Sequence, residues 1–159
     1  MMDNITVRDA RDGEAEVIVQ MIRKMVTDMA GYGGDAPATD GAAWEKITLT
    51  VADDLKRSSA KYVIAETAAG HAVGVGGAEL ITPGGAFAPK KTLHISAIYV
   101  VPQFRRSGIG SALLTSILDW GRAAGSERCD LNVLTNNPAK SLYEKHGFSV
   151  LAVKMVRSF

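Results

Sequence analysis

The spacing of apolar residues divides this 159-residue chain into helices and strands. Val17, Met21, Met25 and Met29 recur at every fourth position, which is typical of one face of a helix. Shorter runs rich in valine and isoleucine, such as 61–66, are typical of strands. The pattern predicts, in chain order, strand 5–8, helices 14–29 and 44–55, strands 61–66, 72–81 and 91–101, helix 108–124, strand 128–134, helix 138–146 and strand 148–157.

Turn signals connect these elements into one mixed α/β domain. The glycine within 67–71 suits a hairpin between two strands. Asn137 and Pro138 suit the start of a helix, and Gly147 suits its end. The central strands follow one another directly, whereas the later strands alternate with helices. The length fits one domain of ordinary size, so we expect a single domain over residues 1–159.

Composition excludes several classes of protein. The net charge of +1 argues against a protein that mainly coats nucleic acid. Cys129 is the single cysteine, so an intramolecular disulfide and a cysteine-rich metal site are excluded. No apolar run approaches the roughly 20 residues of a membrane span, and the first residues lack the pattern of an export signal. We expect a cytoplasmic protein with no membrane partner, no nucleic-acid partner and no metal.

A glycine-rich stretch, called the glycine loop below, lies between strand 91–101 and the helix that follows it. The N–H groups of a helix's first turn have no internal partner and attract anions, and glycine lets an oxygen atom approach the backbone closely. Ser111 and Ala112 exclude a nucleotide-hydrolysing loop, and Leu113 excludes a dinucleotide fingerprint. From this stretch alone, two interpretations stay open: a tight turn with solvated arginines, and a phosphate site. The loop consists of Arg105, Arg106, Ser107, Gly108, Ile109 and Gly110.

A second motif follows at 132–148 and reads NVLTNNPAKSLYEKHGF. Together with R-x-x-G-x-G in the glycine loop, it resembles the GCN5-related N-acetyltransferase (GNAT) family, whose pattern continues as N-x-x-A-x-x-L-Y-x-x-x-G-F. The two motifs occur in the order and at the separation usual for that family. The first half of the chain matches only in its pattern of elements. The matched positions of the second motif are Asn136, Ala139, Leu142, Tyr143, Gly147 and Phe148.

The resemblance implies a fold and a co-substrate. The fold would be a mostly antiparallel sheet of about six or seven strands, splayed between strands 4 and 5 and flanked by about four helices. Acetyl-CoA would place its pyrophosphate on the backbone amides of the glycine loop and touch Asn136. Its pantetheine arm would pair with the strand at Ile98, Tyr99 and Val100, where a backbone N–H would stabilise the oxyanion of the thioester carbonyl.

The same resemblance suggests catalytic roles. Tyr143 matches the general acid that protonates the leaving thiolate. His94 is a candidate general base, and strand alternation would place Ser96 and Ile98 on its face. Glu79 and a water chain are the other candidates for the base, and a structural role for His94 also stays open.

The acceptor is not specified by the sequence. Asp35 and Asp40 lie between the aromatic residues Tyr32 and Trp44, a combination that suits a cationic amine. The expected reaction is direct acetyl transfer to the primary amine of a small molecule or a protein. The alternative is a non-catalytic module that binds or senses acyl-CoA on the same fold. The resemblance also suggests a homodimer formed through the C-terminal strands.

Overall fold

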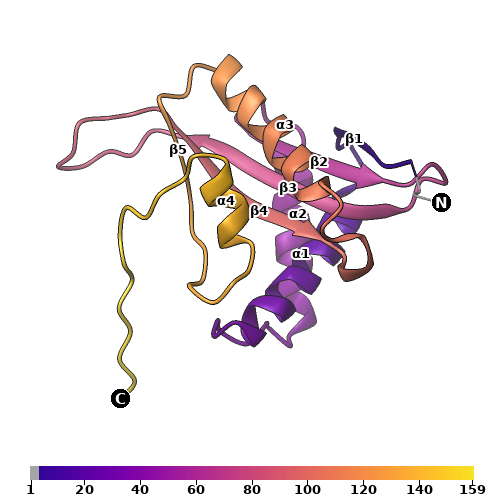
Figure 1. Ribbon diagram of the computed structural model, residues 1–159, viewed down its shortest axis with the longest axis horizontal. Coiled ribbons are helices and arrows are strands. Elements are labelled where there is room, and N and C mark those ends of the chain that lie inside the picture. Colours follow the sequence, from indigo (N-terminus) through magenta and orange to yellow (C-terminus); the bar gives the residue numbers. More distant parts are fainter. Residues whose placement is uncertain (1–3) are drawn as a thin grey trace.

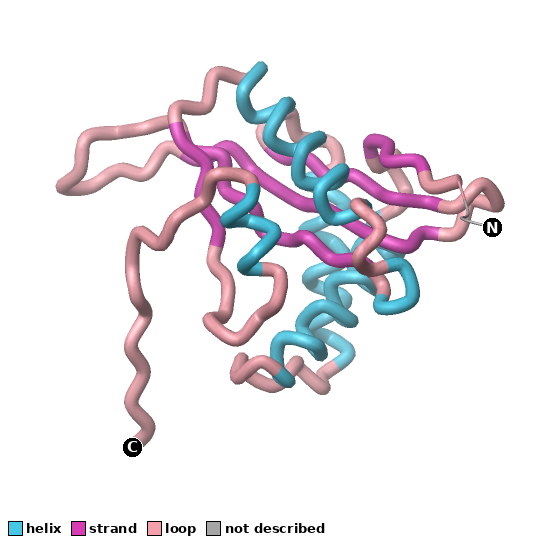
Figure 2. The backbone as a smooth tube through the Cα atoms, in the orientation of Figure 1, coloured by secondary structure: helices cyan, strands magenta, loops and turns pink. Residues whose placement is uncertain are grey.

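The computed structural model describes residues 4–159, which form one five-stranded sheet with helices on both faces (Figures 1 and 2). The strand order is β1-β2-β3-β4-β5. The first three pairings are antiparallel, and β4 pairs with β5 in parallel. The elements are β1 Thr6–Asp9, α1 Ala15–Gly31, α2 Gly41–Asp54, β2 Ala60–Glu66, β3 Ala72–Ile81, β4 Thr92–Val100, the 3-10 turn η1 Pro102–Phe104, α3 Ile109–Ala123, β5 Arg128–Leu131 and α4 Lys140–Lys145.

The expected mixed α/β class is confirmed, but the predicted number of strands is wrong. The sheet of the described residues has five strands rather than six or seven, and its antiparallel character ends at β4. Residues 148–157 form no strand although their composition favours one. β-propensity reflects packing on neighbouring strands, and this segment has none within its own chain. β5 is also shorter than the predicted 128–134.

Two apolar cores occupy the two faces of the sheet. The first core fills the space between the sheet and α3, and contains the fully buried Leu113, Leu114 and Ile117. The second lies under α1 and α2 and includes Ile18 and Ile64. In Figures 1 and 2, α3 and α4 lie in front of the sheet while α1 and α2 lie behind it. Each helix is therefore held mainly by its apolar face rather than by intrinsic propensity.

Local signals explain where α4 begins and ends and where α2 begins. The Asn137 side chain accepts a hydrogen bond of 2.9 Å from the Ala139 backbone N–H at the start of α4. Gly147 follows the end of α4 with a φ of 87°, as the sequence predicts for a left-handed residue there. The Asp40 side chain caps α2 in the same way by accepting from Ala42.

A β-bulge at Ser96 shifts the alternation of β4 side chains between the two faces of the sheet by one residue. Gly77 pairs with Ala97 and Ala78 pairs with Ile95, so Ser96 is an extra residue on β4. Ile95 packs in the α3 core, and beyond the bulge it is Ile98 that packs there. The prediction that Ile98 shares the face of His94 is therefore wrong, because simple alternation does not allow for the inserted residue.

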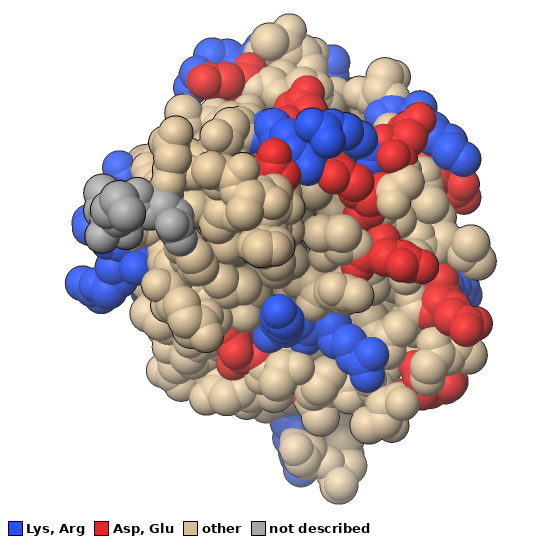
Figure 3. Space-filling view, turned by 90° about the vertical axis from the view of Figure 1, so that its right-hand side faces the viewer, with Lys and Arg blue, Asp and Glu red and all other residues tan. Residues whose placement is uncertain are grey.

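The charged residues of the surface intermix, and the face shown in Figure 3 displays both signs side by side.

Candidate functional site

The sheet opens between β4 and β5. Pairing of the two strands runs from Thr92 with Arg128 to Ile95 with Leu131 and then stops, whereas β4 continues to Val100. The second half of β4 consequently has a neighbour on its β3 side only. The open side of the stretch 96–100 of β4, which has no strand on its β5 side within the described sheet, is called the slot below.

The backbone of β4 presents hydrogen-bonding groups to this slot. Val101 donates its N–H to the Val73 carbonyl of the β3 side at 2.9 Å. Because groups alternate in direction along an antiparallel strand, the N–H and C=O of Ile98 and Val100 point away from β3, toward the slot. Tyr99 pairs toward β3 and buries its ring in the α1 and α2 core. An extended, amide-containing ligand could pair with this edge as a further strand does.

The glycine loop lies at the end of the same strand, before α3. Gly108 has a φ of 85° and Arg106 a φ of 60°, so two left-handed residues shape the turn. The first helical bond runs from the Ala112 N–H to the Gly108 carbonyl at 3.0 Å. The N–H groups of Ile109 and Gly110 therefore precede the helical ladder and face outward with the positive end of the helix dipole. The turn suits an anion such as a phosphate.

Gly110 lies close against α4. A Cβ added at Gly110 would lie 3.2 Å from the Cδ2 atom of Leu142 on α4. Next to it, Ser111 Oγ lies 3.0 Å from His146 Nε2, and His146 Nδ1 lies 3.0 Å from the Leu142 carbonyl. The first turn of α3 and the end of α4 are thus bound to each other, which sets the position of Tyr143.

The arginines of the loop differ in their surroundings. The Arg105 guanidinium donates to Asp28 Oδ2 of α1 at 2.6 Å and to the Val100 carbonyl at 2.8 Å. It also lies over the Tyr99 ring, 5.4 Å from the centroid. Arg105 therefore links the end of β4 to α1 instead of projecting into the anion site. Arg106 is exposed on the loop, and Ser107 turns its hydroxyl back to the Phe104 carbonyl.

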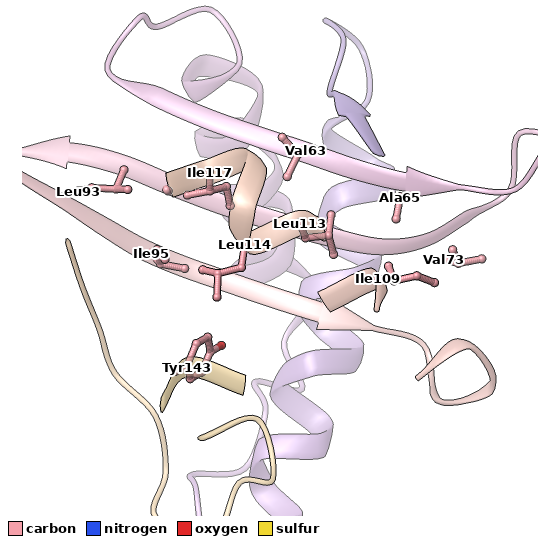
Figure 4. Close-up of a cluster of buried hydrophobic side chains, with 11 residues drawn as sticks. Val63, Ala65, Val73, Leu93, Ile95, Ile109, Leu113, Leu114, Ile117 and Tyr143 are labelled. Atoms are coloured by element: carbon pink, nitrogen blue, oxygen red, sulfur yellow. The ribbon is translucent and has the colours of Figure 1, made fainter. Parts of the chain in front are cut away.

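Tyr143 projects from α4 toward the sheet. Figure 4 shows its ring rising from α4 toward Leu114 and Ile95. The side chain is 8% exposed, and Phe148 packs against it edge-on with ring centroids 5.9 Å apart. Burial raises the pKa of the Tyr143 phenol to about 12. The hydroxyl is protonated at neutral pH, as that of an ordinary tyrosine is, and burial makes it a weaker acid, so only a strongly basic group such as a leaving thiolate would take its proton.

A row of titratable side chains crosses the opposite face of the sheet at the base of the slot. His94 is the register partner of Glu79 on β3 and of Asp130 on β5. His94 Nδ1 lies 2.7 Å from Asp130 Oδ1. Glu79 lies 3.7 Å from the Arg57 guanidinium. The structure therefore brings both sequence candidates for the base into one row and adds a carboxylate that holds the imidazole.

Asp130 is a site residue that sequence patterns do not single out. Its cross-strand position depends on the parallel register of β4 and β5, which no local pattern encodes. The one available signal is an acidic residue in the middle of a short strand, where aspartate is disfavoured.

Asn136 and Cys129 lie after β5 and on β5, respectively. Asn136 is exposed in the turn that follows β5, whose Asn137 N–H donates to the Leu134 carbonyl at 2.9 Å. Cys129 lies on β5, and burial followed by the nearby Asp130 charge raises the pKa of its thiol to about 12. A thiol with so raised a pKa is a poor nucleophile at neutral pH.

Neither a cluster of metal-binding side chains nor a helix that could span a membrane is found in the part of the chain that the structure describes. In residues 4–159 no three histidine, cysteine or acidic side chains cluster in a way that would hold a metal ion. Over the same residues, no helix combines the length and apolarity needed to cross a membrane.

A sheet that splays beside the outward-facing N–H groups of a helix start is the arrangement that the resemblance to acetyltransferases implies. The Acetyltransferase (GNAT) family matches the chain over residues 26–148. The chain belongs to the GNAT acetyltransferase family. No curated protein sequence matches it significantly.

Solved structures share the fold at low sequence identity. One is a putative acetyl transferase from Pyrococcus furiosus, with 23% identity, a TM-score of 0.76, and coverage of 98% of this chain and 100% of that chain. A second is AAC(6')-Iy in complex with a bisubstrate analogue, CoA-S-monomethyl-acetylneamine, with 18% identity, a TM-score of 0.74, and coverage of 98% and 99%. A third is glucosamine-6-phosphate N-acetyltransferase from Arabidopsis thaliana, with 16% identity, a TM-score of 0.65, and coverage of 99% of each chain.

Proposed function

We propose that this protein transfers an acetyl group from acetyl-CoA directly to a primary amine while both are bound. The observation that carries the proposal is the splay of the sheet after Ile95 and Leu131, with the N-terminus of α3 at one side and Tyr143 beneath it. A slot, an anion site and a protonated phenol at one place are the parts that thioester aminolysis needs.

The residues present fit acetyl-CoA. The N–H groups of Gly108, Ile109 and Gly110 would hold the pyrophosphate, and Arg106 would add a cation at the same loop. The backbone of Ile98 and the N–H of Val100 would pair with the amides of the pantetheine arm, since the Val100 carbonyl already accepts a hydrogen bond from Arg105. Asn136, exposed in the turn at the other side of the slot, would contact the same arm.

The reaction forms one C–N bond and breaks one C–S bond. The acceptor arrives as an ammonium ion with a pKa of roughly 10, so it must lose a proton before its nitrogen can attack. We assign this proton to His94 Nε2, directly or through water, because Asp130 engages Nδ1 and leaves the other nitrogen to act as the base. The backbone N–H of Ile98 would stabilise the negative charge that develops on the carbonyl oxygen. Tyr143 would protonate the departing sulfur and recover a proton lost by the attacking nitrogen.

The acceptor would enter from the face of the sheet that carries His94. This face also carries the carboxylates of Glu79 and Asp130, which would attract a cationic amine. The Arg57 guanidinium beside Glu79 offsets part of this negative charge, and the remainder would favour a cationic amine over an anionic acceptor. A small-molecule amine and a protein amine both fit this requirement.

Thiol release from acetyl-CoA in the presence of a panel of amines tests the function. The panel should contain diamines, amino sugars, amino acids and peptides with a free amino terminus, with matched alcohols as controls. Thiol release that depends on an amine, with an acetamide product identified by mass spectrometry, would support the proposal. Tight CoA binding without turnover on any amine would instead support the non-catalytic binding module, and no CoA binding would refute both.

A further inference from the structure

His146 and Ser111 join the end of α4 to the first turn of α3. His146 Nε2 lies 3.0 Å from Ser111 Oγ, and His146 Nδ1 lies 3.0 Å from the Leu142 carbonyl. Both side chains are half-buried. Neither position is specified by the two sequence motifs, since R-x-x-G-x-G ends at Gly110 and the second motif leaves residue 146 free. The contact is therefore a feature of this chain rather than of the motifs.

The two contacts of His146 determine where the neutral imidazole carries its proton. A carbonyl oxygen can only accept, so Nδ1 must donate its proton to Leu142. The neutral ring then has a lone pair at Nε2, and Ser111 must donate its hydroxyl proton to that lone pair. In this state the single proton of the Ser111 hydroxyl is engaged by His146.

Protonation of His146 would reverse the hydrogen bond to Ser111. Both ring nitrogens of an imidazolium are donors, so Nδ1 would keep the Leu142 carbonyl while Nε2 would donate to Ser111 Oγ. The hydroxyl proton of Ser111 would then be free for another acceptor. Both protonation states use the same two contacts, so the change requires no movement of the heavy atoms.

Ser111 lies where its hydroxyl can meet a bound anion. It is the third residue of α3, and its backbone N–H precedes the first helical hydrogen bond, which Ala112 donates to the Gly108 carbonyl. Ser111 and Gly108 also line the same hollow of the surface. A diphosphate held by these N–H groups only accepts hydrogen bonds. It would compete with Nε2 of neutral His146 for the Ser111 proton, and protonation of His146 would end this competition.

The charged side chains around His146 leave the imidazole to respond to a ligand. Three ion pairs engage most of the charges on the surrounding elements: Lys140 with Glu144 on α4, Asp119 with Arg122 on α3, and Arg105 with Asp28. The other charged residues of α4, α3 and the glycine loop are Lys145 and Arg106. Over residues 4–159, none of these side chains forms an ion pair with His146. A diphosphate would bring new negative charge toward the ring, and a nearby anion stabilises the protonated form.

We propose that Ser111 and His146 form a proton-linked part of the diphosphate site, so that binding of the CoA diphosphate is coupled to the uptake of one proton by His146. Ser111 contacts the ligand, and His146 is a positioning residue that directs the Ser111 proton. The proton comes from solvent and is added at Nε2, while the Ser111 hydroxyl transfers its hydrogen bond from Nε2 to a phosphate oxygen; no covalent bond to carbon, sulfur or phosphorus changes. The inference rests on the proposed binding of acetyl-CoA and adds two residues to that site.

The coupling has a definite sign. The bound state holds the His146 proton more tightly than the free state, so affinity should rise as the pH falls through the range in which imidazoles titrate, at roughly pH 6.5. The gain should be lost as the pH rises above this range, because neither state then carries the proton.

Calorimetric titration with dephospho-CoA tests the coupling. This probe keeps the diphosphate but lacks the 3′-phosphate monoester, whose own second ionisation at roughly pH 6 would obscure the effect. Wild type should bind the probe roughly threefold to tenfold more tightly at about pH 5.5 than at about pH 8. Titrations at about pH 7 in buffers with different ionisation enthalpies should report the uptake of a fraction of a proton for each ligand bound.

Variants separate proton linkage from packing. His146→Gln and Ser111→Ala should each abolish the pH dependence and the proton uptake, and the double variant should do no more than either alone. Ser111→Thr keeps the hydroxyl and should retain both effects. His71→Gln is the matched control, because His71 is an exposed histidine between β2 and β3 and its loss should change neither.

The outcomes distinguish this inference from the proposed function. A lower affinity of His146→Gln at every pH, with the pH dependence of wild type, would reduce His146 to a packing role and overturn the inference. Binding of dephospho-CoA by wild type without pH dependence or proton uptake would also overturn it, while the proposed function stands. No binding of the probe at either pH would refute the inference as well, and if CoA itself fails to bind, the proposed function falls with it.

Discussion

Asp28 on α1 and Arg105 in the glycine loop form an ion pair, with 2.6 Å between Oδ2 and the guanidinium nitrogen. The same guanidinium binds the Val100 carbonyl and covers the Tyr99 ring. This side chain therefore joins three parts of the molecule: the helix on the acceptor face, the end of β4 and the proposed phosphate loop. A change at Asp28 should therefore alter the position of the glycine loop, although Asp28 itself would not contact a ligand there.

Asp28→Asn should weaken acetyl-CoA binding more than it destabilises the fold. The pair is partly exposed, so the loss in the free energy of unfolding should stay below about 1 kcal/mol. We expect the KM for acetyl-CoA to rise roughly threefold to tenfold, because the loop loses a support on its α1 side. Steady-state kinetics and urea unfolding measure the two effects. Asp119→Asn, which breaks the more exposed pair with Arg122, is the control and should change neither.

Tyr143→Phe should lower kcat by roughly tenfold to a thousandfold while the Kd for CoA changes little, because one acid–base participant is removed. Calorimetric titration with CoA and steady-state turnover separate the two quantities. Tyr62→Phe is a matched control, since Tyr62 also has a pKa raised to about 12 by burial but packs in the α1 and α2 core. Equal turnover of wild type and Tyr143→Phe would remove Tyr143 from the acid role.

Substitution of His94 by Gln or of Asp130 by Asn should lower kcat/KM by roughly tenfold to a hundredfold at neutral pH. The deficit should shrink as the pH approaches the pKa of the acceptor amine, roughly 10, because the amine then arrives deprotonated. A pH profile of each variant against wild type measures this convergence. Asp130→Glu should recover part of the activity if the carboxylate positions the imidazole. Parallel profiles that never converge would indicate a structural role for the pair.

Glu14 should make stability depend on pH in the acid range. A hydrogen bond from Arg8 lowers the pKa of its carboxyl from the ordinary 4.5 to about 2. A pKa that is lower in the folded state adds stability above pH 4.5, and this contribution is lost as the pH falls toward 2. Glu14→Gln should therefore cost roughly 1–2 kcal/mol near neutral pH, and the two proteins should converge near pH 2. Urea unfolding at a series of pH values gives the comparison. A difference that is constant with pH would show that the carboxylate charge is not responsible.

Gly108→Ala should impair CoA binding through the backbone. Gly108 has a φ of 85°, and no heavy atom lies within 4 Å of the position that an added Cβ would take, so the substitution acts on conformation rather than on packing. Forcing alanine into the left-handed region costs on the order of 1 kcal/mol, and any relaxation would displace the N–H groups that follow. We expect at least a roughly tenfold higher Kd for CoA by calorimetry. Gly13→Ala, at a φ of 89° in a turn away from the loop, should show the same loss of stability with unchanged affinity.

The elements with strong local signals can be predicted from the sequence. The four-residue spacing of apolar residues locates α1, and the glycine loop locates the start of α3. The composition of segment 148–157 predicts a strand, yet strand formation requires an edge that the chain does not bring to it. The bulge at Ser96 cannot be foreseen either, since an inserted residue leaves an apolar strand with the same appearance.

The same distinction applies to the site. Tyr143 and the glycine loop can be identified because each motif is contiguous in the chain. The contact between His94 and Asp130 depends on the register of two strands separated by a helix, and the engagement of Arg105 by Asp28 depends on how α1 crosses the sheet. Both are tertiary relationships with no trace in local spacing.

Because of the extra residue at Ser96, the two halves of β4 would face different substrates. Up to the bulge, β4 turns His94 toward the face where an amine would enter. Beyond the bulge, the edge of the strand would bind the thioester. Substitutions before the bulge should therefore alter which amine is accepted without changing the affinity for the acyl donor. Deletion of Ser96 would instead exchange the core face and the acceptor face over the rest of the strand.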